Sequence, residues 1–388
     1  MTRRALVVGD GSAAFALPAV RSLARAGWTV GVAQPEPGLA TSSRACTRYH
    51  VVPRVEHGPQ AWTSIVAQVL HEGGYDMVFP TDDIELLALS SARDALPAVV
   101  PYPPHEVVLA SVDKLGLTRA AQQVGLGVPV TRSADPAQIA ATTGTVVVKT
   151  RLHWSPGAET EDRHLPVQFA TGPAQVAAAV ERVRAGGGEP VLQEVLEGSL
   201  MALTVVLDRA GRLAAASHQV TLRETSRRTS ARAVTVTPDE ELERRCVDLL
   251  TSLGWWGPAN LQFLRAADGV PKLIDLNGRF YGSLGLAVTA GADIPAVWAQ
   301  VTLQEPVGPV QRARPGVRFQ AFDEDLLALR ARGRLPAGAP EAALFALRAT
   351  HSIWDPRDPR PALDRQRLRL ARAVGRRATA AGAKPAHR

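Results

Sequence analysis

Short apolar runs alternate with helical patterns through the first hundred residues of the chain. Each apolar run is long enough for one strand, and each helical pattern repeats apolar residues at intervals of three and four. The expected strands span residues 5–8, 29–33 and 77–80. The expected helices span residues 12–26, 61–71 and 82–91. Strands that alternate with helices along a chain indicate a parallel sheet with helices packed on it.

The pattern changes after Asp113, where paired strands join the helices. A strand is expected at residues 145–149, a strand or hinge at 191–196, and a hairpin at 202–208 and 213–220. The helices expected in this part span residues 115–124, 176–184 and 240–253. Beyond residue 305 the pattern weakens to short helices at 326–330 and 342–349, a loop at 351–361 and a basic helix at 363–378. This mixture predicts an α+β architecture that ends in a helical segment.

Polar residues stand at regular offsets within two strand-like segments of residues 260–283. Asp275, Asn277 and Arg279 alternate along the second segment, so they would project to one face of a strand. Gln262 lies on the first segment and would join them across a hairpin. Carboxylate and amide oxygens beside a guanidinium suit a hard cation together with phosphate. The alternative is an amphipathic hairpin whose polar face contacts only water.

The same run resembles the metal-binding end of the ATP-grasp superfamily. Its segments NLQF and LIDLNGRFYGS are most similar to a branch of predicted carboxylate–amine ligases, and the glutamine resembles the carbamoyl-phosphate synthase large chain. The resemblance implies that Gln262, Asp275 and Asn277 hold Mg²⁺ (or Mn²⁺). It also implies that Asn277 and Arg279 are catalytic, with Arg279 beside the transferred phosphoryl group. Asp275 stands where the family usually has glutamate, and Gly278 where it usually has proline.

Two lysines fall on positions that the resemblance assigns to ATP. The chain has only four lysines, and Lys114 and Lys149 match the pair that reaches the nucleotide phosphates in the family. Lys149 stands at the end of an expected strand, where its ammonium would act as a point charge. Because most lysines are solvated, a surface position is the alternative for either one.

A third motif, QEVLEG, resembles the family hinge QEYIPG that binds adenine. The resemblance implies ATP contacts for its first five residues, which are Gln193, Glu194, Val195, Leu196 and Glu197. The carboxylate that usually holds the ribose is missing after Gly198, and Glu197 is the candidate replacement. Polar loops at 150–165 and 223–230 are candidates for phosphate or acceptor contacts, and plain solvent exposure is the alternative. In the first loop, Arg151, His153 and Ser155 stand where the family usually has glycines.

The resemblance implies four segments. Residues 1–110 would form an α/β Rossmann-like (pre-ATP-grasp) domain, which precedes an α+β two-lobe ATP-grasp fold. Residues 111–196 would form its small lobe, and residues 197–305 its large lobe with the metal site. Residues 306–388 would form a short, basic, helical C-terminal extension whose end is expected to be disordered.

Charge and composition limit the kinds of partner that we expect. The net charge of +7 comes almost entirely from arginine and is concentrated in the C-terminal tail, without aromatic stacking motifs, so nucleic acid is not an expected partner. No apolar stretch reaches membrane-spanning length. Cys46 and Cys246 match no metal or redox spacing, which fits a reducing cytoplasm. We therefore expect a cytoplasmic protein that acts on small molecules, with a homodimer as the family-level expectation.

The function implied by the resemblance is an ATP-dependent carboxylate–amine ligase. It would form an amide through an acyl phosphate and release ADP and phosphate. The alternatives are a bicarbonate-activating carboxylase or carbamoyl-phosphate-type enzyme, and a nucleotide-binding protein that has lost turnover. A dinucleotide site is a further alternative, because Gly9 and Gly11 follow a strand and open a helix. No acidic residue clearly ends the second strand, so a turn without nucleotide is favoured there.

Overall fold

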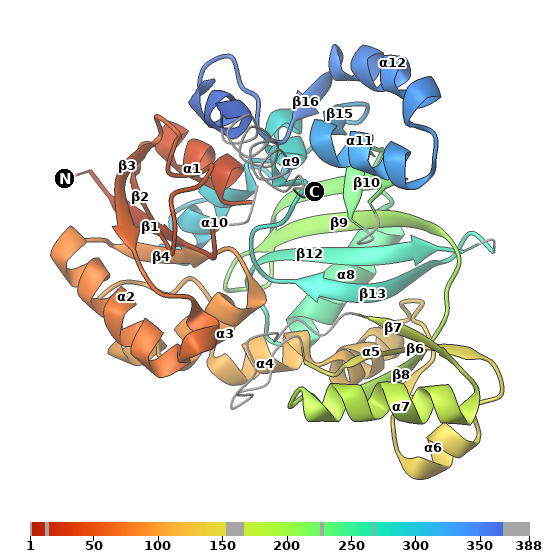
Figure 1. Cartoon of the computed structure of the whole chain (residues 1–388). Coiled ribbons are helices and arrows are strands. Elements are labelled where there is room, and N and C mark those ends of the chain that lie inside the picture. The colour runs from red at the N-terminus through yellow and green to blue at the C-terminus, as the bar shows by residue number, and fades with distance from the viewer. Residues whose placement is uncertain (1, 12–14, 153–166, 226–228, 267, 368–388) are drawn as a thin grey trace, which may run out of the picture.

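The computed structural model describes residues 2–11, 15–152, 167–225, 229–266 and 268–367, which form three sheets with covering helices (Figure 1). The basic tail beyond residue 367 lies outside these ranges. So does most of the loop at 150–165, including His153 and Ser155.

The N-terminal sheet is parallel, as expected, and has the strand order β3-β2-β1-β4. Its strands are β1 (Arg4–Val8), β2 (Thr29–Gln34), β3 (Cys46–Val51) and β4 (Met77–Pro80). Its helices are α1 (Ala16–Arg25), η1 (Val55–His57), α2 (Pro59–Gly73), α3 (Asp83–Ser91) and η2 (Arg93–Ala95). Strand β4 is buried throughout and β1 everywhere except its first residue, which is typical of parallel strands covered on both faces.

The largest sheet has the order β13-β12-β9-β10-β11-β15-β16, with β14 beside β10. Its long antiparallel strands are β9 (Ser199–Leu207), β10 (Leu213–Glu224), β11 (Ser230–Thr235), β12 (Gly257–Arg265) and β13 (Pro271–Asn277). Its helices are α8 (Glu240–Ser252), α9 (Leu284–Ala290) and α10 (Ile294–Thr302). Helix α10 contacts α1 on one side and β9 and β12 on the other, so it joins the two sheets.

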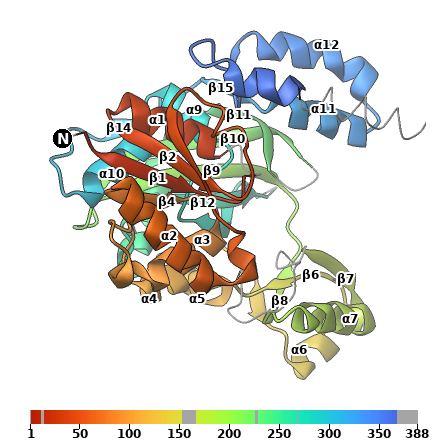
Figure 2. The same cartoon turned by 60° about the vertical axis from the view of Figure 1, so that its left-hand side comes forward.

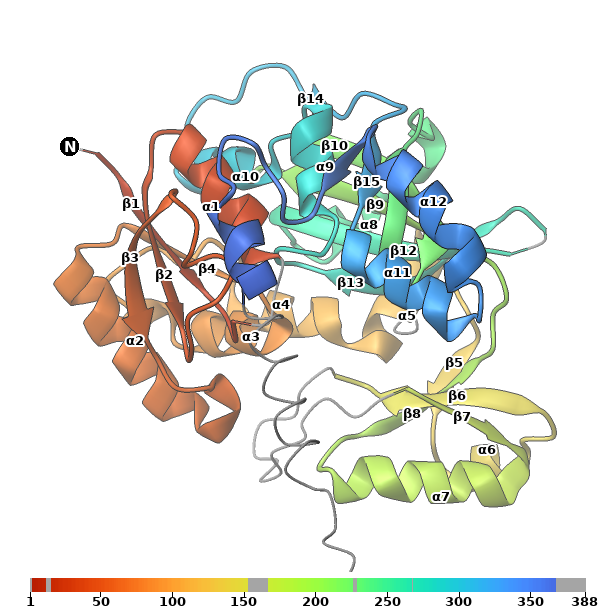
Figure 3. The same ribbon diagram turned by 45° about the horizontal axis from the view of Figure 1, so that its top comes forward.

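A smaller antiparallel sheet forms a separate lobe, set apart from the other two sheets in Figures 2 and 3. It has the order β5-β8-β6-β7. Its elements are β5 (Thr131–Ser133), α6 (Pro136–Ala140), β6 (Thr145–Thr150), β7 (Gln168–Thr171), α7 (Gly172–Ala185) and β8 (Pro190–Glu194). Helices α4 (His105–Val112) and α5 (Lys114–Gln123) lead into it, and α5 also packs against α8 and β13.

The C-terminal segment contains the expected helices and also short strands. Helices α11 (Phe322–Ala331) and α12 (Leu335–Ala346) lie between β14 (Gln311–Arg312), β15 (Arg318–Gln320) and β16 (Ala349–His351). The helix expected at 342–349 is therefore wrong at both ends. Residues 349–351 pair in parallel with β15 instead, a long-range contact that no local pattern signals.

Two large apolar cores hold the layers together, and a third, small cluster contains Ala233, Leu286 and Phe319. One core runs continuously from the N-terminal sheet through α10 to the large sheet. At its centre the ring of Trp298 lies 4.8 Å from Phe79 and 5.2 Å from Phe280, centroid to centroid. The small lobe has its own core around Val148 and Val180. The N-terminal and large sheets thus form one packed body, and the small lobe forms a second.

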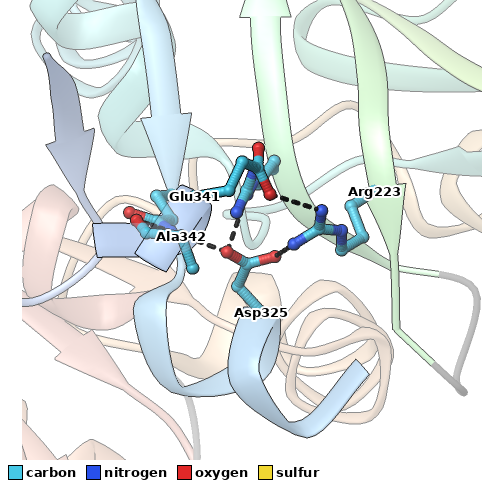
Figure 4. Close-up of polar contacts among 6 residues, drawn as sticks. Arg223, Asp325, Glu341 and Ala342 are labelled. Atoms are coloured by element: carbon cyan, nitrogen blue, oxygen red, sulfur yellow. Dashed lines mark hydrogen bonds and ion pairs between the residues drawn. The ribbon is translucent and has the colours of Figure 1, made fainter. Parts of the chain in front are cut away.

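A buried ionic network fastens the C-terminal helices to the large sheet (Figure 4). Asp325 of α11 is fully buried and accepts hydrogen bonds from Arg223 at 2.7 Å, Arg232 at 2.7 Å and Gln320 at 2.6 Å. Glu341 of α12 also accepts from both arginines. Arg223 was considered for a ligand-binding loop at 223–230. The structure instead commits its guanidinium to this network, and residues 226–228 lie outside the described ranges.

Within the described ranges, no single helix is long and apolar enough to cross a membrane. Helices α9 and α10 pass that test only as a pair, and they are bent by 88° at their junction.

Candidate active site

The polar residues of the β12–β13 hairpin share one face, as their spacing predicts. In the antiparallel register Gln262 lies opposite Asp275, and Asn260 lies opposite Asn277. Residues two apart on a strand face the same side, so these four side chains lie together. Strand β13 ends at Asn277, so the alternation does not extend to Arg279.

This face offers oxygen donors of the kinds that Mg²⁺ prefers. Gln262 and Asn277 supply amide oxygens, and Asp275 supplies one carboxylate. Proteins commonly hold Mg²⁺ through one or two carboxylates together with substrate phosphates, rather than in an all-protein cage. In the described part of the chain, no group of three or more His, Cys, Asp or Glu is placed to hold a metal ion.

Lys114 brings a buried positive charge to this face. It begins α5, and its Nζ lies 4.0 Å from Oδ1 of Asp275. The side chain is 8% exposed, and the Nζ atom finds no hydrogen-bond partner among the described residues. Burying an ammonium without a hydrogen bond is costly, so this atom favours an anionic ligand beside it.

Lys149 approaches from the small lobe, at the end of β6. Its burial and the neighbouring charge of Lys114 lower the pKa of Lys149 to about 8, and Asp275 opposes part of this effect. Lys149 therefore lies within electrostatic reach of both residues, although it belongs to the small lobe. Two positive charges and one carboxylate thus act on one another across the two lobes, an arrangement suited to phosphate and a divalent metal.

The start of α5 is fixed by an ion pair between the lobes. Asp113 caps the helix by accepting from the backbone N–H of Leu115 at 3.0 Å. Arg151 donates to both oxygens of Asp113, at 2.7 and 2.6 Å, and also to Glu189. Burial opposes the ionisation of Asp113, yet these bonds hold its pKa below the usual value. Arg151, considered for phosphate binding, instead orients Lys114 by anchoring its helix.

The hinge residues lie beside the hairpin at the end of β8. Gln193 is buried, donates to Thr131 Oγ1 at 2.8 Å, and helps to line a small pocket between the lobes. The pocket residues are Lys114, Leu117, Thr118, Gln193, Leu273 and Ile274. Gln193 and Lys114 therefore border the same pocket, and the adenine contact of the hinge stays a prediction.

Other hinge residues have partners or exposure that the sequence does not signal. Glu194 accepts from Lys272 Nζ at 3.1 Å, and its backbone N–H donates to Val130 O at 2.9 Å. Leu196 is half-buried, whereas Val195 and Glu197 are exposed. The ATP contacts of these residues, including a ribose contact by Glu197, stay predictions.

Three glycines of these motifs are explained by close packing. A Cβ atom at Gly278 would lie 2.4 Å from the ring of Trp255, so the proline usual in the family has no room here. A Cβ at Gly198 would lie 2.4 Å from the backbone oxygen of Arg265. At Gly9 it would lie 2.2 Å from Thr81 Oγ1, so that glycine allows the turns after β1 and β4 to meet. A dinucleotide is not needed to account for it.

Arg279 reaches the N-terminal domain. Its Nε and Nη2 donate to the two carboxylate oxygens of Asp83 at 3.1 and 3.3 Å, and its Nη1 donates to Phe280 O at 3.0 Å. Burial opposes its charge, but Asp83, Asp82 and Asp275 together raise the pKa of Arg279. Arg279 therefore lies between the hairpin face and the acidic start of α3. Sequence reasoning missed Asp83, whose only local signal is the acidic pair directly after strand β4.

Residues 189–324 match a family model described as ATP-grasp in the biosynthetic pathway with Ter operon. No curated protein matches the sequence.

Three solved structures of low sequence identity share the fold. One is the biotin carboxylase domain of 2-oxoglutarate carboxylase from Hydrogenobacter thermophilus, solved with MgADP and bicarbonate. It is 13% identical, with a TM-score of 0.65 over 82% of this chain and 73% of that one. L-amino acid ligase from Bacillus licheniformis is 18% identical, with a TM-score of 0.62 over 81% of this chain and 78% of that one. N5-carboxyaminoimidazole synthetase from Staphylococcus aureus is 12% identical, with a TM-score of 0.64 over 85% of each chain.

The expected fold class is thus confirmed: a Rossmann-like domain precedes a two-lobed α+β unit, and helices follow. The segment boundaries at 110, 196 and 305 stay predictions. The family model runs from β8 to the start of α11 and includes the hairpin with Asp275, while the common fold extends over four-fifths of the chain. The chain thus contains a segment, residues 189–324, that matches an ATP-grasp family model, within a fold that it shares with the three solved structures.

Proposed function

We propose that this protein is an ATP-dependent ligase that joins a carboxylic acid to an amine and releases ADP and phosphate. The observation that carries the proposal is the position of Lys114, whose ammonium lies 4.0 Å from Asp275 and is buried without a hydrogen-bond partner among the described residues, while both residues act on the charge of Lys149. A nucleotide triphosphate supplies the anions that such a site lacks. The fold shared with L-amino acid ligase supports a ligase, and the fold shared with a domain solved with MgADP supports the nucleotide.

The residues would divide the work as follows. Lys114 and Lys149 would neutralise the phosphates, Gln193 and Glu194 would border the adenine, and Gln262, Asp275 and Asn277 would hold Mg²⁺. When bound, the metal would polarise the phosphoryl group and offset its charge. The residues of the site would mainly position the reactants and neutralise charge, so no protein nucleophile is required.

The reaction would proceed in two displacements. A carboxylate oxygen of the acid attacks the γ-phosphorus of ATP, the bond to the β-phosphate oxygen breaks, and ADP leaves. The neutral amine then attacks the acyl carbon of the resulting acyl phosphate, inorganic phosphate leaves, and the amine loses a proton. Arg279 has five N–H donors and its contacts with Asp83 and Phe280 use three, so the remaining two would face the transferred group.

A screen for ADP release tests this function. We expect the purified full-length protein to release ADP only when an acid and an amine are both present, with an amide detected by mass spectrometry. ADP release that bicarbonate stimulates without any organic acid would instead support a carboxylase. Tight ATP binding without ADP release in any mixture would support a protein that has lost turnover.

The charge of Lys149 predicts a pH dependence of ATP binding. With a pKa of about 8 in the free protein, this amine is charged below pH 8 and neutral above it. We therefore expect the Kd for MgATP, measured by calorimetry, to rise as pH increases through 8, approaching about tenfold per pH unit. The variant Lys149→Arg keeps its charge and should give a flat profile over the same range. A wild-type Kd that does not change between about pH 7 and 9.5 would contradict this role.

A further inference from the structure

Four acidic side chains gather at the carboxyl edge of the N-terminal sheet. Asp10 follows β1, Asp82 and Glu85 lie at the start of α3 after β4, and Glu56 lies in η1. Helix α3 packs against η1, and the charges of Asp82, Asp10 and Glu56 all act on Glu85. The cluster is therefore one electrostatic unit, although its members come from three parts of the chain.

The cluster occupies the place where open α/β sheets bind ligands. In the order β3-β2-β1-β4, the chain proceeds outward from β1 to β2 and β3 and then crosses to β4 on the other side of β1. The order therefore reverses between β1 and β4. A crevice forms outside the carboxyl ends of strands at such a switch point. Asp10 and Asp82 follow the two strands that flank it.

Two oxygen atoms of this cluster are buried without a partner. Glu85 is 3% exposed, and its Oε2 accepts no hydrogen bond from the described residues; the same holds for Oε2 of Glu56. Burial of Glu85, with the charges of Asp82, Asp10 and Glu56, raises its pKa well above the usual value. Buried carboxylate oxygens are normally hydrogen-bonded, so these two atoms point to a donor that the described residues do not supply.

Arg279, a cation beside this cluster in the described part of the chain, does not fill that role. Arg279 is bound to Asp83 through Nε and Nη2, and Asp83 is a separate carboxylate on the same helix. The same guanidinium lies within the influence of Asp275 on the hairpin. Arg279 thus links the acidic cluster to the face that would hold the metal and the phosphates, and a ligand of the cluster would lie near the phosphoryl group.

We propose that Asp10, Glu56, Asp82 and Glu85 form a subsite for an organic cation, and that the acid activated by this enzyme carries a protonated amine. The carboxylate of such a molecule would lie toward Arg279 and Asp275, and its ammonium group toward Glu85. An ammonium group fits better than a metal ion, because the described residues contain no group of acids placed to hold a metal. Amino acids are the simplest substrates of this class. The proposal rests on the ligase function proposed above and names its acid.

Matched substrates and one neutral variant test the subsite. ADP release by the full-length protein is measured with standard amino acids, with their N-acetyl derivatives and with the corresponding acids that lack the amine. We expect only the free amino acids to support turnover. Glu85→Gln, which keeps the shape and removes the charge, should raise the KM for the amino acid at least tenfold and leave the KM for ATP unchanged. Glu72→Gln on the exposed side of α2 is the matched control and should behave as wild type.

The outcomes separate this proposal from the ligase function. If acids without an amine support ADP release as well as amino acids do, the subsite proposal is wrong and the ligase proposal is unaffected. The same holds if Glu85→Gln leaves the KM for amino acids unchanged. If no mixture releases ADP, the ligase proposal fails, and thermal stabilisation by the same compounds decides on the subsite. The subsite is supported if free amino acids raise the Tm of the wild type and Glu85→Gln abolishes this effect. It is overturned if none of the compounds raises the Tm.

Discussion

Replacement of Asp275 by alanine should abolish ATP turnover while the protein stays folded. Asp275 is the carboxylate on the β12–β13 face, it lies 4.0 Å from Lys114, and it influences the charge of Lys149. Its removal would take away the proposed anionic metal ligand and the one carboxylate that offsets the charges of the two ammonium groups. Losing a preorganised charge contact of this kind typically costs about 10²–10³-fold in kcat. The measurement is ADP release with saturating substrates, alongside circular dichroism to confirm the fold.

A second replacement in the same hairpin serves as the control. Asp268 is exposed in the turn between β12 and β13, where it accepts from the backbone N–H of Val270. Asp268→Ala should therefore keep wild-type turnover. If Asp275→Ala retains amine-dependent ADP release, the assignment of this hairpin to the nucleotide site is wrong.

Replacement of Asp325 by alanine should give the largest loss of stability among single polar substitutions in the C-terminal segment. Its carboxylate is fully buried and pairs with Arg223 and Arg232, and Arg232 is itself almost fully buried. Removing one partner of a buried ion pair leaves uncompensated charge in the interior and costs about 3–5 kcal/mol. The free energy of unfolding, measured by urea denaturation, should fall by this amount.

An exposed ion pair gives the comparison. Glu181 pairs with Arg184 on α7 at 2.7 Å, but both side chains are largely exposed. Glu181→Ala should change the free energy of unfolding by less than about 1 kcal/mol, because water screens such pairs. If Asp325→Ala unfolds at the same urea concentration as the wild type, the network in Figure 4 does not hold the C-terminal helices to the sheet.

The hairpin could be predicted because its information is local. Asp275 and Asn277 are two residues apart on a strand, and that spacing alone determines that they share a face. The opposing residue, Gln262, follows from the turn that joins the strands. The same holds for β1, β2 and β4 of the N-terminal sheet, which are buried apolar runs. Strand β3 was not predicted, because its residues Cys46–Val51 are mostly polar and partly exposed. The period and spacing of apolar and polar residues were sufficient wherever a single strand or helix contained the whole pattern.

The contacts between distant segments could not be predicted in this way. Arg279 and Asp83 are 196 residues apart, and nothing around either residue indicates that they pair. Arg151 and Arg223 were read as loop cations for a ligand, yet each binds carboxylates of the fold. Strands β14, β15 and β16 have two or three residues each, too few to show an alternating pattern, and exist only through their partners. Their pairing depends on tertiary contacts that override local preference.

The separate cores of the small lobe and the main body make the pKa of Lys149 depend on how the two lie relative to each other. Lys149 belongs to the small lobe, whereas Lys114 and Asp275, which both act on its amine, belong to the body that contains the other two sheets. A rigid movement of the small lobe would break no contact within either core, but it would separate Lys149 from both neighbours. Its pKa would then return toward the value of an ordinary solvated lysine. The pKa of Lys149 would thus report whether the two lobes are closed, and it can be measured without any nucleotide present.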